Sequence, residues 1–150
     1  MTPAVSPDVP PVRVSWVRFA SAMGAILGGL AVVFGAFGAH GLREILGTAE
    51  LGWWDKAAHY HLIHALALVA CGIAYQHRVT APGRGGARCL AIAAAGFLAG
   101  IALFSGSLYA MALTGVRGLG AVTPLGGVAF IAAWIALAVG LWPAARSPNT

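Results

Sequence analysis

The fold class that the sequence predicts is an all-α membrane protein, a bundle of four transmembrane helices. Of its 150 residues, 59% are hydrophobic and only 9% are charged, whereas a soluble domain carries roughly a quarter charged residues. Charged residues are absent from four long segments, 19–42, 57–77, 89–116 and 118–145. Since about 20 apolar helical residues cross a hydrocarbon core of about 30 Å, each segment can span a bilayer.

Tails are predicted at both ends of the chain, around a four-helix domain at 16–142. Residues 1–15 are rich in proline and lack the positive start and short apolar core of a signal peptide, so they are predicted to be disordered. Residues 143–150 form the second tail. The first helix is predicted at about 17–39. Small residues let helix backbones approach closely in lipid, which predicts a packing role for four of its glycines: Gly24, Gly28, Gly35 and Gly38.

A connecting segment at 41–56 separates the first helix from the second, which is predicted at about 57–76. The segment alternates apolar and charged residues and ends with the pair Trp53 and Trp54. Tryptophan favours the headgroup region, because its indole ring is apolar and carries a single donor. The segment is therefore predicted to lie along the membrane interface.

The third helix is predicted at about 89–113 and the fourth at about 119–142. The third repeats the GxxxG spacing with Gly96 and Gly100, for which a packing role is again predicted. Pro124 removes a backbone donor within the fourth segment. The fourth helix therefore either begins near Pro124 or bends there.

Basic residues predict how the helices are oriented. One side of the membrane would carry six, namely Arg13, Arg18, Arg78, Arg84, Arg88 and Arg146, and the other three, namely Arg43, Lys56 and Arg117. Because cytoplasmic loops hold the excess of Lys and Arg, both termini are predicted to be inside. The formal net charge of +5 does not indicate nucleic acid, since these residues form no basic stripe.

Histidines gather near one end of the predicted bundle. His40 ends the first helix, and three others lie in the second: His59, His61 and His64. At about 100° per residue, Tyr60, His61 and His64 share one face, and His59 points away. His64 lies about 10 Å inside the helix, where an unsatisfied polar group costs several kcal/mol. It must therefore face protein, water or a ligand.

The third helix adds hydroxyl groups to this region. Ser105 and Tyr109 share a face at i, i+4, and Ser107 lies between them. A serine in a membrane helix commonly bonds the carbonyl one turn back, and no acid or base stands beside these serines in the sequence. No enzyme activity is therefore predicted. The candidate polar cluster is His40, Tyr60, His61, His64, Ser105 and Tyr109.

Three interpretations of this cluster are open. In the first, His40, His61 and His64 supply nitrogen ligands to a metal ion or a haem; otherwise no cofactor is expected. In the second, the side chains form interhelical hydrogen bonds that tie the second helix to its neighbours. In the third, they form a proton relay or the polar pocket of a small-solute transporter, because ionisable groups inside a membrane are often functional.

Four ordered motifs resemble the YgdD-like family of small inner-membrane proteins: GAFGAHGL at 35–42, YHLIHALAL at 60–68, LFSGSLY at 103–109 and TPLGG at 123–127. The family is described as a domain of unknown function, number 423, and it is similar to a small animal transmembrane protein of mitochondria. The resemblance implies a four-helix inner-membrane protein and no activity. The residues in its signature positions are His40, Tyr60, His64, Ser105, Tyr109 and Thr123.

The sequence thus predicts a multi-pass protein of the bacterial inner (plasma) membrane, with a structural or accessory role. Its expected partners are the lipid bilayer, a second copy of the chain or a larger membrane complex. A small-solute or proton transporter and a metal or haem protein are the alternatives. A ligand site would require the histidines to converge, whereas a packing role would require each to bond a neighbouring group.

Overall fold

The computed structural model describes residues 15–80 and 86–142. Within these residues the chain forms helices and no strand, which confirms the all-α fold class. Four helical segments are long and apolar enough to cross a membrane: Trp16–His40, Thr48–Val79, Ala87–Thr114 and Arg117–Leu141. The predicted tails, 1–15 and 143–150, lie outside the described residues apart from Ser15.

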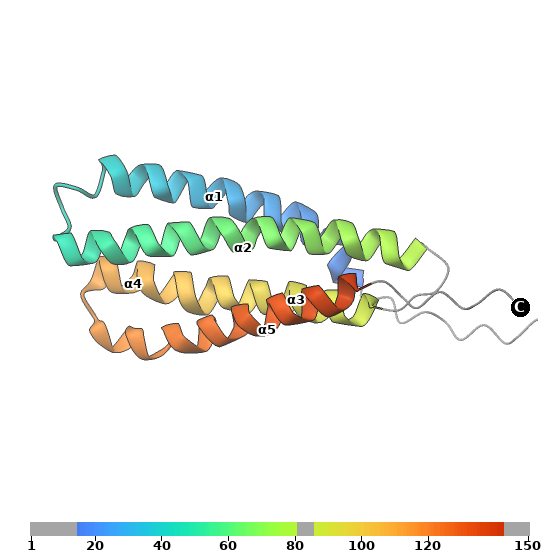
Figure 1. The fold of residues 1–150 in the computed structure, drawn as a ribbon. Coiled ribbons are helices and arrows are strands. Elements are labelled where there is room, and N and C mark those ends of the chain that lie inside the picture. The colour runs from blue at the N-terminus through green and yellow to red at the C-terminus, as the bar shows by residue number, and fades with distance from the viewer. Residues whose placement is uncertain (1–14, 81–85, 143–150) are drawn as a thin grey trace, which may run out of the picture.

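The four helical segments lie side by side in a bundle, and the chain enters and leaves it at the same end (Figure 1). Helix α1 packs mainly against α2, and α5 packs mainly against α3. In chain order the elements are the 3-10 helix η1 (Ser15–Phe19), α1 (Ala20–His40), α2 (Thr48–Thr80), α3 (Ala87–Gly100), the π-helix η2 (Ile101–Ser105), α4 (Gly106–Thr114), the 3-10 helix η3 (Arg117–Ala121) and α5 (Thr123–Leu141).

Helix α2 starts earlier than the sequence predicts. It begins at Thr48, not near residue 57, so residues 48–56 of the predicted connecting segment form its first turns. Trp54 is 4% exposed, and its Nε1 donates a hydrogen bond of 2.7 Å to the Phe34 carbonyl. The indole thus finds its acceptor inside the protein. With 33 residues, α2 is about 50 Å long and exceeds the hydrocarbon core.

The third span is continuous but not a regular α-helix. Between α3 and α4, residues 101–105 form a π-helical turn in which the Gly106 N–H donates to the Ile101 carbonyl, five residues earlier. Such turns insert one residue into a helix and are frequent at functional sites. In the fourth span, α5 begins at Thr123 with Pro124 in its first turn, where proline's missing N–H is tolerated. The helix therefore starts near this proline rather than bending there.

Glycines allow close approach between α1 and α2, but not at every predicted position. A Cβ on Gly24 would lie 2.7 Å from both the Ala65 carbonyl oxygen and the Val69 nitrogen, and one on Gly38 would overlap the Trp54 indole. A Cβ on Gly28 would have its nearest contact at 3.9 Å, and one on Gly35 would meet nothing within 4 Å. Gly35 therefore does not lie at a close helix contact within the chain.

The second glycine-dependent contact joins the third span to α5. A Cβ on Gly96 would lie 2.9 Å from the Ala133 Cβ, and one on Gly100 would overlap the Phe130 ring. On the opposite side of this contact, a Cβ on Gly126 would overlap the backbone of Phe104. Gly126 is not among the predicted packing glycines, because it forms no GxxxG pair with any of them.

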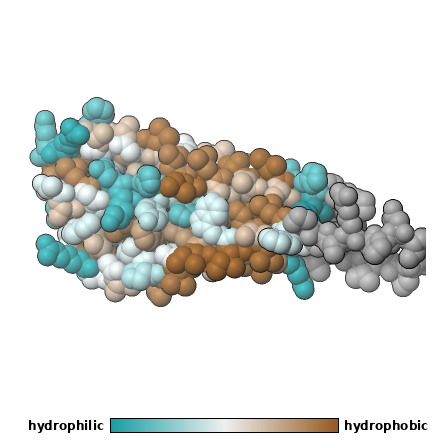
Figure 2. All heavy atoms as spheres, viewed as in Figure 1, coloured by the Kyte–Doolittle hydropathy of each residue, from teal (hydrophilic) through white to brown (hydrophobic). Residues whose placement is uncertain are grey.

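The outer surface of the bundle is largely apolar. Figure 2 shows hydrophobic side chains over the α1 and α5 sides of the visible face, with hydrophilic side chains gathered toward its two ends. Large aliphatic side chains are exposed along both helices, including Ile26, Leu30, Val128, Ile131 and Ile135. Soluble monomers rarely expose an apolar surface of this extent to water, whereas the apolar interior of a bilayer accommodates it.

Candidate functional site: a histidine and aromatic cluster

His64 lies at the contact between α2 and α5. Its side chain is 5% exposed, and its Nδ1 donates a hydrogen bond of 2.7 Å to the Tyr60 carbonyl one turn earlier. Its imidazole stacks on Phe130 of α5, with ring centroids 3.4 Å apart and planes 9° apart. His64 therefore bonds its own helix through one edge and packs against a neighbouring helix through its face.

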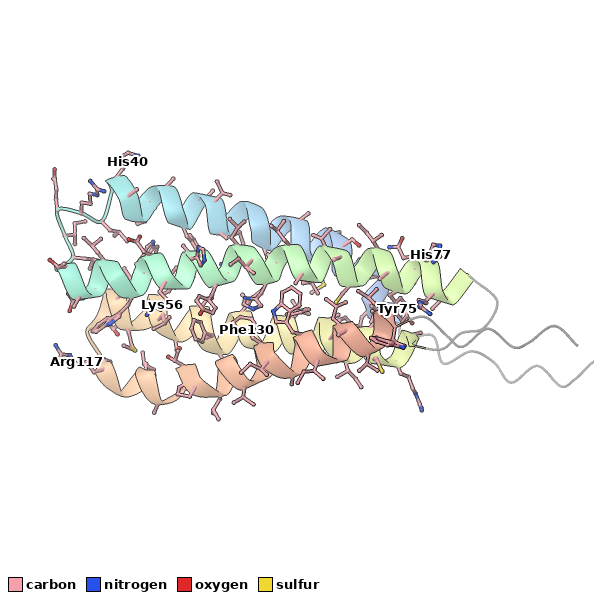
Figure 3. The ribbon with its side chains drawn as sticks, in the orientation of Figure 1. His40, Lys56, Tyr75, His77, Arg117 and Phe130 are labelled. Carbon is pink, nitrogen blue, oxygen red and sulfur yellow. The ribbon has the colours of Figure 1, made fainter. Side chains whose placement is uncertain are left out.

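Further aromatic rings contact this pair. Tyr60 lies 5.8 Å from His64 in a stacked arrangement, and its ring also meets Phe104 of η2, with centroids 4.6 Å apart. Gly100 leaves the space that the Phe130 ring occupies, and Figure 3 shows this ring between α2 and α5. Aromatic contacts of this kind contribute about 0.5–1.5 kcal/mol each beyond their buried area.

His61 faces another part of the bundle, toward α1 and α4. It is 4% exposed, and its Nδ1 lies 3.5 Å from the hydroxyl of Tyr109. Its ring also meets Phe34 of α1, at a centroid distance of 6.2 Å. The other ring nitrogen, Nε2, is buried and has no hydrogen-bond partner among the described residues.

Tyr109 belongs to an aromatic group that joins three helices. Its ring lies 4.6 Å from Trp54 of α2 and 5.1 Å from Phe34 of α1. The Trp54 indole in turn bonds the Phe34 carbonyl. This group holds the end of the bundle where α1 connects to α2 and α4 connects to α5, and no metal or catalytic chemistry is needed to account for it.

The two serines of the third span differ in their bonding. The Ser107 hydroxyl donates to the Phe104 carbonyl at 3.0 Å and lies 2.8 Å from the Thr123 hydroxyl on α5. The Ser105 hydroxyl is 0% exposed and has no partner among the described residues. The expected bond to the carbonyl one turn back is therefore absent at Ser105, which ends the π-helical turn.

The histidines do not converge on a common point. His40 is exposed at the end of α1 and points away from the bundle (Figure 3). His61 and His64 contact different aromatic partners, Tyr109 and Phe130, and His59 is exposed. Among residues 15–80 and 86–142, no group of three or more His, Cys, Asp and Glu side chains is placed to hold a metal ion. The metal or haem interpretation therefore lacks its ligand set there.

Sequence reasoning missed the aromatic partners that complete this site. Phe34, Phe104 and Phe130 carry no polar group, and no short-range spacing distinguishes them from lipid-facing residues. The helical period of α2 was informative, because the predicted face with Ala57, His61, His64 and Leu68 is buried. Tyr60 lies at the edge of this face and is 39% exposed.

Comparison with known proteins gives relatives over most of the chain. The family described as a protein of unknown function, DUF423, matches residues 34–127. A UPF0382 membrane protein of Staphylococcus saprophyticus is 42% identical over 120 residues, which cover 79% of this chain and 92% of the relative. The UPF0382 inner membrane protein YgdD of Escherichia coli K12 is 39% identical over 123 residues, covering 82% and 88%. No solved structure matches.

Proposed function

Since this chain belongs to the DUF423 family, whose relatives are named UPF0382 membrane proteins, we propose that it is a structural or accessory component of its membrane. The proposal includes no enzymatic step. The Escherichia coli relative is named an inner membrane protein, and we extend this location to the chain. The prediction that both termini are cytoplasmic is part of the same proposal.

The observation that carries this proposal is the bonding of His64. This histidine is a buried polar side chain in the membrane span. Its Nδ1 bonds the Tyr60 carbonyl, and its ring stacks on Phe130. Both contacts are internal to the bundle. The bond places the hydrogen on Nδ1, and the stack holds the face of the ring against another helix, so both contacts give this imidazole a packing role.

Proton flux through reconstituted vesicles tests this proposal against the transporter alternative. The purified chain would be placed in liposomes that contain a pH-sensitive dye, and the decay of an imposed pH gradient would be followed. We expect the same decay as in vesicles that carry the double variant His61→Ala, His64→Ala. A faster decay with the natural chain, abolished in this variant, would overturn the packing role.

A second copy of the chain is the partner that we propose within the membrane. The support is the surface of α1, which packs mainly against α2 and leaves a second face of small residues exposed: Ala22, Ala25, Gly29 and Ala36. Bulky side chains are more usual against lipid, and small ones let helices approach. The face is uncharged and can pair with itself about a two-fold axis, as in most homodimers.

Disulfide crosslinking tests this pairing. After Cys71 and Cys89 are replaced by Ala, single cysteines would be introduced by Ala25→Cys or Ala36→Cys, with Leu30→Cys as the control on the bulky face of α1. We expect oxidation in native membranes to give a covalent dimer for the first two variants and not for the control. Equal yields at all three positions, or no dimer at any of them, would contradict a specific α1 interface.

A further inference from the structure

Two buried polar atoms lie on α2 and on the third span that packs against it. His61 Nε2 and Ser105 Oγ have no hydrogen-bond partner among the described residues. Buried polar groups in proteins are almost always bonded, either to protein or to ordered water. Inside a membrane, where lipid offers neither donor nor acceptor, an unbonded group is especially unfavourable.

The contact of Nδ1 with Tyr109 leaves the other ring nitrogen of His61, Nε2, in need of a hydrogen-bond partner. Nδ1 lies 3.5 Å from the Tyr109 hydroxyl. If the phenol donates to Nδ1, then Nε2 carries the hydrogen and needs an acceptor; if Nδ1 donates, then Nε2 needs a donor. Nε2 therefore requires a partner in both tautomers. At 3.5 Å the existing contact is also long for a hydrogen bond, so the Tyr109 hydroxyl can bond a further group.

Ser105 and Tyr109 lie one helical turn apart on the same side of the third span, and this span packs against α2 through both η2 and α4. The π-helical turn widens the helix where Ser105 lies. At the adjacent Gly106, a Cβ would meet only the Ile101 carbonyl of its own helix, at 3.8 Å. Gly106, which is half-buried, therefore makes no close contact with another helix, unlike Gly100 and Gly126, where a Cβ would overlap neighbouring atoms.

We propose that His61, Ser105 and Tyr109 form an internal binding site for ordered water. The ligand is a small neutral molecule with both donors and acceptors, because segments 57–77 and 89–116 contain no Asp, Glu, Lys or Arg to balance a charge. Water satisfies the imidazole in either tautomer and bonds both hydroxyls. This site goes beyond the packing role, since it gives a shared partner to His61 Nε2 and Ser105 Oγ, which no described residue bonds.

The substitution Ser105→Ala distinguishes a hydrated hydroxyl from an unbonded one. Removal of an unbonded buried hydroxyl relieves an unfavourable group and raises stability, whereas removal of a water-bonded hydroxyl lowers it. We expect Ser105→Ala to lower the melting temperature of the detergent-solubilised protein by several degrees. The control is Ser107→Ala, which loses direct bonds to Phe104 and Thr123 and lowers the melting temperature in either case. An unchanged or higher melting temperature for Ser105→Ala would overturn the proposal.

Magnetisation transfer between water and histidine side chains provides a second readout that does not depend on stability. The protein would be labelled with nitrogen-15 at histidine, and the His61 signals would be identified by their loss in His61→Phe. We expect cross-peaks between water and the His61 ring that weaken in Ser105→Ala. Exposed His59 serves as the positive control for water contact. Cross-peaks at His59 with none at His61 would show that the site is dry.

Discussion

The imidazole of His64 and the phenyl ring of Phe130 lie face to face, with centroids 3.4 Å apart and planes inclined by 9°. This stack joins α2 to α5, two helices whose main packing partners are α1 and α3. The bond from His64 Nδ1 to the Tyr60 carbonyl fixes the ring in the plane that the stack requires. One polar residue thus provides a direct contact between two membrane helices that otherwise pack mainly on other partners.

Replacement of His64 by alanine is expected to destabilise the bundle. The change removes the stack on Phe130 and the bond to Tyr60, which together account for about 1–3 kcal/mol. Thermal unfolding in detergent would measure the effect. The matched control is His59→Ala, since His59 is exposed on the same helix. Equal stability of the two variants would count against a packing role for His64, and His64→Phe is expected to recover part of the loss by keeping the stack.

The glycines of α1 are expected to differ sharply in their tolerance of a methyl group. Gly24→Ala would force the α2 backbone at Ala65 and Val69 away from α1, and overpacking of this kind typically costs about 1–3 kcal/mol. Gly35→Ala adds a methyl group to open space and is expected to be neutral or stabilising by up to about 1 kcal/mol, because alanine favours the helix. Melting temperatures of the two variants would test this contrast. A destabilising Gly35→Ala would indicate a partner on that face.

Both termini are expected on the cytoplasmic side. Arg18 in η1, Arg78 near the end of α2 and Arg88 at the start of α3 belong to the end of the bundle where the chain enters and leaves. Figure 3 shows Lys56 and Arg117 toward the other end, with His40. Reporter insertions at 81–85 and at 115–116 would establish the topology. An alkaline phosphatase reporter should be inactive at the first position and active at the second. The reverse pattern would refute the assignment.

Metal content is expected to be the same in the natural chain and in the triple variant His40→Ala, His61→Ala, His64→Ala. The reason is geometric, because His40 points away from the bundle and the other two side chains contact separate aromatic residues. Elemental analysis and an absorption spectrum of the detergent-purified proteins would measure this. A stoichiometric metal or a haem band in the natural chain, lost in the variant, would restore the metal interpretation.

Periodicity predicted the buried face of α2 but not its partners. The arc that holds Ala57, His61, His64 and Leu68 is set by the geometry of one helix, and these residues are buried. Phe130 lies on another span, and only the packing of α2 beside α5 brings it to His64. The spacing of residues within one helix does not predict a contact with a residue on another span.

The early start of α2 shows the same limit. Paired tryptophans such as Trp53 and Trp54 are typical of interfacial segments, and the sequence therefore predicted an interfacial segment at 41–56. The acceptor for the Trp54 indole is the Phe34 carbonyl, and it becomes available only when α1 and α2 pack together. A tertiary hydrogen bond therefore decided where this indole lies.

By itself, the sequence determined that the chain crosses a membrane four times, because the absence of charge over about 20 residues is a one-dimensional property that lipid enforces. Only the tertiary structure decided which polar groups are satisfied. It stacked His64 on Phe130, it separated His40 from His61, and it left His61 Nε2 and Ser105 Oγ without partners among the described residues. A hydrogen bond or ring contact between separate helices is made or lost by a shift of a few tenths of an ångström, and the helix positions are fixed only when the helices pack.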